Sequence, residues 1–280
     1  LKLTKYAHDS IPLLEVIIYL LCSYEARAFG FISHFYRKCL KTFLIYIAMK
    51  YVFRQLNIKT IKERYYTVIL IIICIALILW LGIKEKNRHT NRLNKIPIRI
   101  NINGIRGKST ITRMIYSVLR EDHYHVIGKT TGTDARMLYW FTDKEYPVIR
   151  KPQGANIGEQ RDIVRKVVKQ KADSLVNECM AVNPDYQITF QKDLVKANIG
   201  VIVNVMEDHM DVLGPTLQDV AQAFTATIPY KGTLVVMKDD YTKFFAKEAK
   251  KRKTKLIVVD KDEVPESYLR KFPYLVFPDN

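Results

Sequence analysis

One segment of this chain is too apolar and too long for an ordinary soluble domain. Residues 65–83 read YYTVILIIICIALILWLGI and carry no charge. As a helix they would extend about 28 Å, close to the roughly 30 Å of a bilayer's hydrocarbon core. Tyr65, Tyr66 and Trp80 lie near its ends, where interfacial aromatic side chains belong. The segment predicts a transmembrane helix rather than a buried helix of a soluble core.

Basic side chains flank this segment on both sides, so the positive-inside rule only weakly favours a cytoplasmic carboxyl-terminal side. A nucleotide site downstream would support that orientation, because ATP is inside the cell. Residues 84–95 are expected to form a basic linker that faces lipid head groups. The net charge of +17 suggests an anionic partner, and its placement favours a membrane over nucleic acid.

Residues 1–64 form a basic segment of uncertain role. Two apolar pieces, 11–24 and 43–53, are too short to span a bilayer comfortably, and we expect them either to lie in the membrane interface or to carry no selected function. The chain starts at Leu1 and ends at Asn280 directly after a predicted strand. A truncated carboxyl terminus is therefore expected.

After Asn94, short β-branched runs alternate with charged helical segments. The expected strands are 96–102, 125–129, 174–179, 199–205, 232–238, 255–260 and 274–277, and the expected helices are 108–121, 161–171, 185–197, 217–227 and 240–251. This order predicts an α/β catalytic domain over 96–280, whose mostly parallel sheet is covered on both faces and includes 199–205 as a fully buried strand. Ligands of such sheets bind beyond the carboxyl ends of the strands.

A glycine-rich turn joins the first of these strands to a helix. It reads Gly104, Ile105, Arg106, Gly107, Lys108, Ser109, Thr110. Glycines at such a turn let backbone N–H groups surround phosphate oxygens, and the helix amino terminus adds its positive dipole end. Lys108 would reach the β- and γ-phosphates, and the Ser109 hydroxyl would bind Mg²⁺. The longer GxxxxGK[ST] pattern fails at Ile102, but the shorter GxxGK[ST] form is satisfied.

Two further strands end in groups that bind hard cations. Glu178 closes one of them, and the other leads into Glu207-Asp208-His209-Met210-Asp211. Carboxylate oxygens suit a cation that is bound to phosphates, so Glu178 is expected within reach of the nucleotide's Mg²⁺. Each feature alone fits an ordinary salt bridge or a polar loop equally well. Their joint occurrence after buried strands favours a metal-nucleotide site.

These motifs resemble the Mur ligase superfamily, in which a GxxGK[ST] loop is followed by an NxxxDHxDxxG signature, here residues 204–214. The chain is more closely similar to the ligase subunits of bacterial poly-γ-glutamate synthases over about residues 65–280. The segments that carry this closer resemblance are GKTTGTDAR at 128–136, KPQG at 151–154, NIGEQ at 156–160 and ECMAVNPDY at 178–186.

The resemblance implies an ATP-dependent amide ligase that is tethered to the cell membrane with its catalytic domain in the cytoplasm. ATP would activate a glutamate γ-carboxylate as an acyl phosphate, and the amino group of another glutamate would attack it. Lys108, Glu178 and His209 would be catalytic, with Ser109 and Glu178 holding one Mg²⁺ and His209 a second. The implied partners are glutamate, the growing poly-γ-glutamate, the membrane and other membrane subunits of a synthase complex; nucleic acid is not among them.

Some features depart from the family pattern or stay open. Many Mur-type ligases carry a carbamylated lysine about fifteen residues after the DH pair, but residues 221–227 contain no lysine, which makes the second metal site less certain. Thr131, Thr133, Arg136 and Gln153 either bind substrate carboxylates or serve as turn and capping residues. Two other functions remain: a related ligase that adds glutamate to a folate or wall precursor, and a membrane-associated P-loop ATPase that powers a partner.

Overall fold

The computed structural model describes residues 61–132, 134–150 and 154–260, together with Pro265 and Ser267. The predictions for residues 1–60, Thr133, Gln153 and the strand at 274–277 lie outside the described residues. The chain divides into two compact units, Leu1–Arg88 and His89–Asn280.

Helix α3 dominates the described part of the first unit. It runs over Ile61–Leu93, so it contains the predicted 65–83 helix and continues through most of the expected linker. Its stretch Val68–Leu93 is long and apolar enough to cross a membrane by length and composition. Side chains such as Ile72, Leu79 and Trp80 are exposed along it. An exposed apolar surface of this length is what a lipid-facing helix requires.

The second unit is built on one eight-stranded sheet in the order β4-β3-β2-β5-β1-β6-β7-β8. Among the described strands, six pair in parallel, and β3 pairs antiparallel with both β2 and the edge strand β4. The strands are β1 (Ile98–Asn103), β2 (Val126–Lys129), β3 (Arg136–Tyr139), β4 (Tyr146–Pro147), β5 (Ser174–Glu178), β6 (Ile199–Ile202), β7 (Thr233–Met237) and β8 (Lys255–Val259). The predicted α/β fold with a mostly parallel sheet is confirmed.

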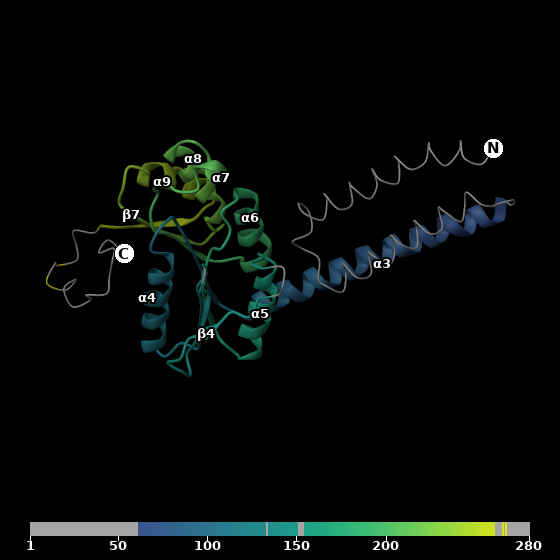
Figure 1. The fold of residues 1–280 in the computed structure, drawn as a ribbon, viewed down its shortest axis with the longest axis horizontal. Helices are drawn as coiled ribbons and strands as arrows, with labels where there is room; N and C mark the ends of the chain where they lie inside the picture. Colours follow the sequence, from purple (N-terminus) through teal and green to yellow (C-terminus); the bar gives the residue numbers. More distant parts are fainter. Residues whose placement is uncertain (1–60, 133, 151–153, 261–264, 266, 268–280) are drawn as a thin grey trace, which may run out of the picture. The chain divides into compact units, whose positions relative to one another are not determined.

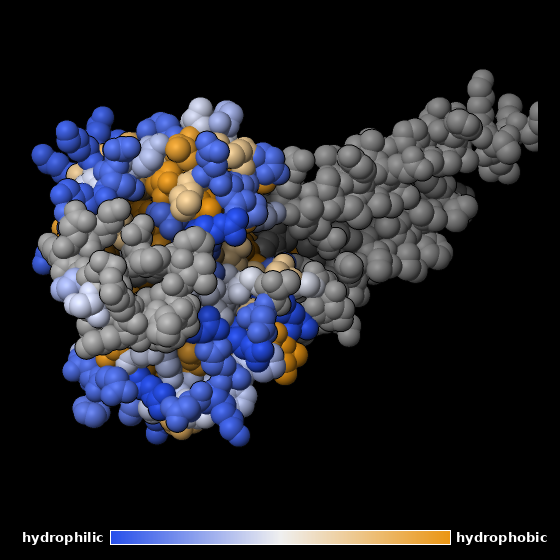
Figure 2. All heavy atoms as spheres, turned by 60° about the vertical axis from the view of Figure 1, so that its left-hand side comes forward, coloured by the Kyte–Doolittle hydropathy of each residue, from blue (hydrophilic) through white to orange (hydrophobic). Residues whose placement is uncertain are grey.

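Helices cover the two faces of this sheet unequally. Figure 1 shows α4 on one side of the sheet, and α5 and α6 on the other. The helical segments are α4 (Lys108–Glu121), α5 (Glu159–Lys169), α6 (Pro184–Thr189), η1 (Phe190–Val195), α7 (Met210–Leu213), α8 (Leu217–Phe224), η2 (Thr225–Thr227) and α9 (Thr242–Lys251). On the face seen in Figure 2, the described surface is largely hydrophilic with smaller hydrophobic areas, as expected where one face of each helix meets water.

The prediction that 199–205 is a fully buried strand is wrong. Strand β6 ends at Ile202, and Ile199 and Val201 are only partly buried. Helix α4 packs against β1, β2 and β5, whereas Gly200 and Ile202 face the side where α8 and α9 build a core. The alternate residues of β6 therefore lack a full helical cover among the described elements, because successive strand side chains point to opposite faces.

Two other elements differ from the prediction. The helix expected at 185–197 begins with a proline at Pro184, after the Asn183 side chain accepts the Asp185 N–H, and changes to a π-helical turn at Phe190. The antiparallel pair β3–β4 was not expected at all. Both strands are short, and their sequences show no alternation long enough to predict a strand.

Candidate functional site

The glycine-rich loop lies at the carboxyl end of β1, the central strand between β5 and β6. Gly104 has a φ of +136°, and a Cβ there would lie 3.1 Å from the backbone nitrogen of Asn204. Gly107 has a φ of +80° and precedes the first turn of α4. Gly104 is needed both because a side chain would clash and because its φ is positive, and Gly107 is needed because its φ is positive. The loop predicted from the sequence is thus held tightly against the end of β6.

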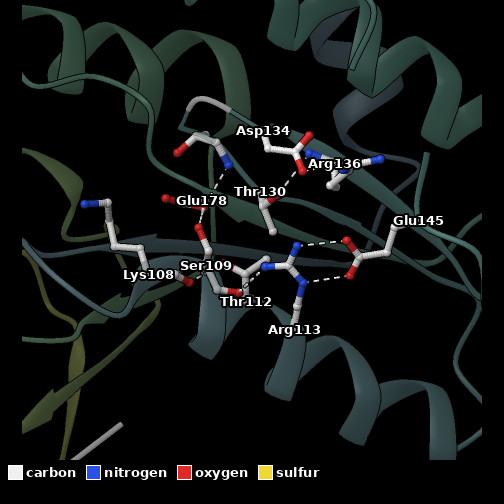
Figure 3. Close-up of polar contacts among 10 residues, drawn as sticks. Lys108, Ser109, Thr112, Arg113, Thr130, Asp134, Arg136, Glu145 and Glu178 are labelled. Atoms are coloured by element: carbon white, nitrogen blue, oxygen red, sulfur yellow. Dashed lines mark hydrogen bonds and ion pairs between the residues drawn. The ribbon is translucent and has the colours of Figure 1, made fainter. Parts of the chain in front are cut away.

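Lys108 lies in the first turn of α4 and folds back over the loop. Its Nζ donates to the carbonyl oxygens of Gly104 at 2.8 Å and Ile105 at 2.9 Å. Burial lowers the pKa of Lys108, and the nearby Glu178 carboxylate opposes that shift. In Figure 3 its side chain extends away from Ser109 and Glu178. The Lys108 ammonium lies over the loop, so it can turn from these carbonyls to a phosphate bound at the loop amides.

Ser109 and Glu178 meet at the expected place. The register pairs Ile102 of β1 with Glu178 of β5, so both strands end at the same level. The Ser109 hydroxyl donates to Glu178 Oε2 at 2.8 Å (Figure 3). The Thr131 backbone N–H donates to the same oxygen at 2.8 Å. Glu178 is buried. Three segments distant in sequence therefore converge on one carboxylate oxygen.

This pair of oxygens fits a small divalent cation. Two neighbouring ligands of an octahedral Mg²⁺, each at about 2.1 Å, lie about 3 Å apart, close to the separation of the Ser109 and Glu178 oxygens. Within the described residues, no three His, Cys, Asp or Glu side chains gather closely enough to hold a metal by themselves. The pair could therefore supply two ligands of a cation whose other ligands come from phosphate and water.

His209 is placed differently. It lies beyond the end of β6 with a φ of +53°, its side chain is 54% exposed, and its Nδ1 is 3.7 Å from Asp208 Oδ1. Asp208 also forms an ion pair with Arg106 at 2.8 Å. The predicted site residue His209 is thus next to the glycine-rich loop through Arg106 and Asp208, but no contact joins it to Glu178.

The lysine-free segment after the DH pair has a structural role. Val220, Ala221, Ala223 and Phe224 of α8 are buried in the core that α8 shares with β6, β7 and α9. A lysine on these buried positions would lose its hydration. Apart from the exposed Gln222, residues 221–227 are buried, and the absence of lysine at those buried positions agrees with this packing.

Of the predicted substrate residues, Thr131 and Arg136 are described. Thr131 is buried and contributes the backbone N–H to Glu178. Arg136 donates its backbone N–H to the Thr130 hydroxyl and its guanidinium to Asp134 (Figure 3). Thr130 and Arg136 thus brace the loop that presents Thr131 to Glu178.

An ion pair links this loop region to α4. Arg113 of α4 binds both carboxylate oxygens of Glu145, at 2.7 and 2.8 Å, just before β4. The pKa of Glu145 is lowered by its hydrogen bonds with Arg113. Arg113 lies one turn after Ser109 on α4. The Arg113–Glu145 ion pair therefore fixes β3 and β4 relative to the helix that carries the Ser109 hydroxyl.

Sequence reasoning missed Lys129 and Asn204. Lys129 at the end of β2 is 0% exposed and pairs with Glu159 at 2.7 Å, and burial lowers its pKa. Asn204 accepts the backbone N–H groups of Ile105 and Arg106 through Oδ1, both at 3.1 Å. The lone lysine that ends an apolar strand was a usable signal for the first. For Asn204 the signal was its place as the first residue of the NxxxDHxDxxG signature at 204–214.

Known proteins resemble this chain in sequence. Residues 102–273 match the family model described as the Mur ligase middle domain. PGA synthase CapB of Bacillus subtilis (strain 168) is 59% identical over 211 residues, which cover 75% of this chain and 54% of that protein. The capsule biosynthesis protein CapB of Bacillus anthracis is 57% identical over 208 residues, which cover 74% and 45%.

Among solved structures, Escherichia coli FolC in complex with ADP matches with a TM-score of 0.48 and 16% identity, over 62% of this chain and 45% of that one. The chain spans about half the length of the curated relatives it matches. Because the family model covers more than half of the sequence, from the end of β1 past β8, the chain belongs to the Mur ligase family through that family's middle domain.

Proposed function

We propose that this protein is an ATP-dependent, ADP-forming ligase that joins glutamate residues through their γ-carboxyl groups to make poly-γ-glutamate. The observation that carries the proposal is the convergence of Ser109, Thr131 and Glu178 beside the glycine-rich loop. The names of the two relatives, a PGA synthase and a capsule biosynthesis protein, support the choice of product.

The proposed reaction has two displacement steps. A γ-carboxylate oxygen attacks the γ-phosphorus of ATP, the bond to the β-phosphate oxygen breaks, and ADP leaves. The amino nitrogen of a second glutamate then attacks the acyl carbon, loses a proton, and expels inorganic phosphate. The first step is needed because a carboxylate is a poor electrophile until its oxygen becomes part of a leaving group.

The residues of this chain have distinct tasks in these steps. The loop amides and Lys108 bind the phosphates, and Ser109 with Glu178 holds a divalent cation against them. That cation, when bound, stabilises charge on the transferring phosphoryl group. The Thr131 amide fixes the orientation of Glu178. His209, beyond the end of β6, would be a ligand of a second cation. Mg²⁺ is the proposed metal, because oxygen ligands beside phosphates suit it.

The proposed location is the cell membrane, with α3 as a single-pass anchor and the catalytic domain in the cytoplasm. The exposed apolar surface of α3 supports the anchor, and the need for ATP supports the orientation. Protease added to intact cells should leave residues 84–280 undigested, and lysis should expose them. Digestion in intact cells would contradict the orientation. Other membrane subunits of a synthase complex are the proposed partners.

Membranes that contain the full chain, supplied with ATP, Mg²⁺ and labelled glutamate, test the activity. We expect glutamate-dependent release of ADP and phosphate and an acidic, protease-resistant polymer. Membranes with Lys108→Ala should give neither, and should contain equal amounts of folded protein. ATP hydrolysis that does not depend on glutamate would favour the ATPase function instead, and label transfer to an added folate would favour the folate-type ligase.

A further inference from the structure

Arg106 is the one cationic side chain between the two glycines of the loop, and its backbone is clamped in place. Its N–H donates to Asn204 Oδ1 and its carbonyl oxygen accepts from Asn204 Nδ2, both at 3.1 Å. The neighbouring Ile105 N–H donates to the same Oδ1. One amide side chain therefore fixes the point from which the Arg106 side chain projects, at the rim of the expected phosphate site.

The guanidinium itself is held loosely. The Arg106 side chain is 59% exposed and its Nη2 lies 2.8 Å from Asp208 Oδ2. The Asp208 side chain is 27% exposed, so water reaches the pair mainly from the Arg106 side. Ion pairs that water screens contribute little to stability, and side-chain entropy opposes them. Arg106 can therefore exchange Asp208 for another anion at little cost.

Lys108 is the other cation of the loop. Lys108 donates to two loop carbonyls and is more buried than Arg106. A triphosphate carries more charge than one ammonium group balances. A guanidinium is always protonated in proteins, and its planar fork matches phosphate oxygens in a bidentate manner.

We propose that the Arg106 side chain is a phosphate-binding group of the nucleotide site. When ATP binds, the Arg106 guanidinium breaks its ion pair with Asp208 and binds the terminal phosphate instead. This inference rests on the proposed function, because it takes ATP as the nucleotide. It goes beyond the role of the loop amides, since it assigns a contact to a side chain. The exchange also frees the Asp208 carboxylate beside His209 when ATP is bound.

Nucleotide affinities of the full chain in detergent test the proposal. Arg106→Gln should raise the ATP dissociation constant about tenfold, the size of one charge-assisted contact, and change that of ADP less than twofold. Arg106→Lys should recover part of the loss. Arg120→Gln is the matched control: Arg120 also pairs with an aspartate, Asp143, and its loss should change neither constant. Unchanged ATP affinity in Arg106→Gln would overturn the proposal.

A double-mutant cycle with Asp208→Asn separates direct contact from an indirect effect. If Arg106 binds phosphate, the ATP penalty of Arg106→Gln persists in the Asp208→Asn background. If Arg106 acts only by positioning Asp208, the penalty disappears, and the proposal is overturned. Wild-type protein that binds no ATP would overturn the proposed function as well. Wild-type protein that binds ATP and makes polymer, with Arg106→Gln unaffected, would overturn this inference alone.

Discussion

The carboxyl ends of β5 and β6 flank the same loop and are organised in opposite ways. At the end of β5, the Glu178 carboxylate is buried and receives two hydrogen bonds from other elements. At the end of β6, the Asp208 side chain is 27% exposed and pairs with Arg106 of the loop, and the His209 side chain is 54% exposed. The first site is assembled before ligands arrive. The second has to be completed by them, because exposed side chains keep their conformational freedom.

Changing Glu178 should have the largest effect. Glu178→Gln keeps the shape but removes the charge that a cation needs, so ATP cleavage and ligation should both fall by at least a thousandfold, on the order of several kcal/mol of transition-state stabilisation. Measuring phosphate release and polymer formation checks this. Normal turnover in this variant would break the comparison, because the enclosed site would then be dispensable.

His209→Ala should have an intermediate effect. We expect ligation to fall about tenfold and the Mg²⁺ concentration for half-maximal rate to rise, because an exposed imidazole is a weak Mg²⁺ ligand. ATP affinity should stay within about twofold of wild type, because His209 pairs with Asp208 and not with a residue of the loop itself. Loss of ATP binding here, together with normal turnover in Glu178→Gln, would reverse the assignment of first and second sites.

Raising the pH should weaken nucleotide binding through Lys108. Its pKa is lowered by burial, so the ammonium loses its proton at a lower pH than an exposed lysine does. The sign follows from the charge: the protonated form binds phosphate, and affinity falls as pH rises through the lowered pKa. ATP titrations of wild type and Lys108→Arg between pH 7 and about pH 10.5 test this, because arginine stays charged over that range. Parallel curves for the two proteins would contradict the assignment.

Thiol labelling should show the smallest effect and sharpen the contrast in exposure. Burial raises the pKa of Cys179, next to Glu178, to about 11, so its thiolate is scarce at neutral pH. An alkylating reagent should modify Cys179 slowly. In Met206→Cys the new thiol lies at the exposed end of β6 and should react at least tenfold faster. Similar rates at the two positions would show that the end of β5 is open.

The sequence predicted the elements that depend on local pattern. The α4 helix has the predicted bounds, 108–121, because a glycine-rich turn and a regular apolar face define it. The β3–β4 pair was not predicted, because its strands are too short to show an alternating pattern. The partial cover of β6 was not predicted, because it depends on which helix lies over which strand. The domain boundaries and the roles of the site residues remain predictions.

In the candidate site, too, the sequence identifies some features and the tertiary structure alone shows the others. The sequence by itself determined the loop Gly104–Ser109 and the residue types Glu178 and His209, because phosphate and Mg²⁺ chemistry restricts which residues can serve. Only the tertiary structure decided that Thr131 supports Glu178, that Asn204 clamps the loop, and that Arg106 pairs with Asp208. These contacts join residues 47 to 102 positions apart, as the parallel order β5-β1-β6 brings separate strand ends to one edge.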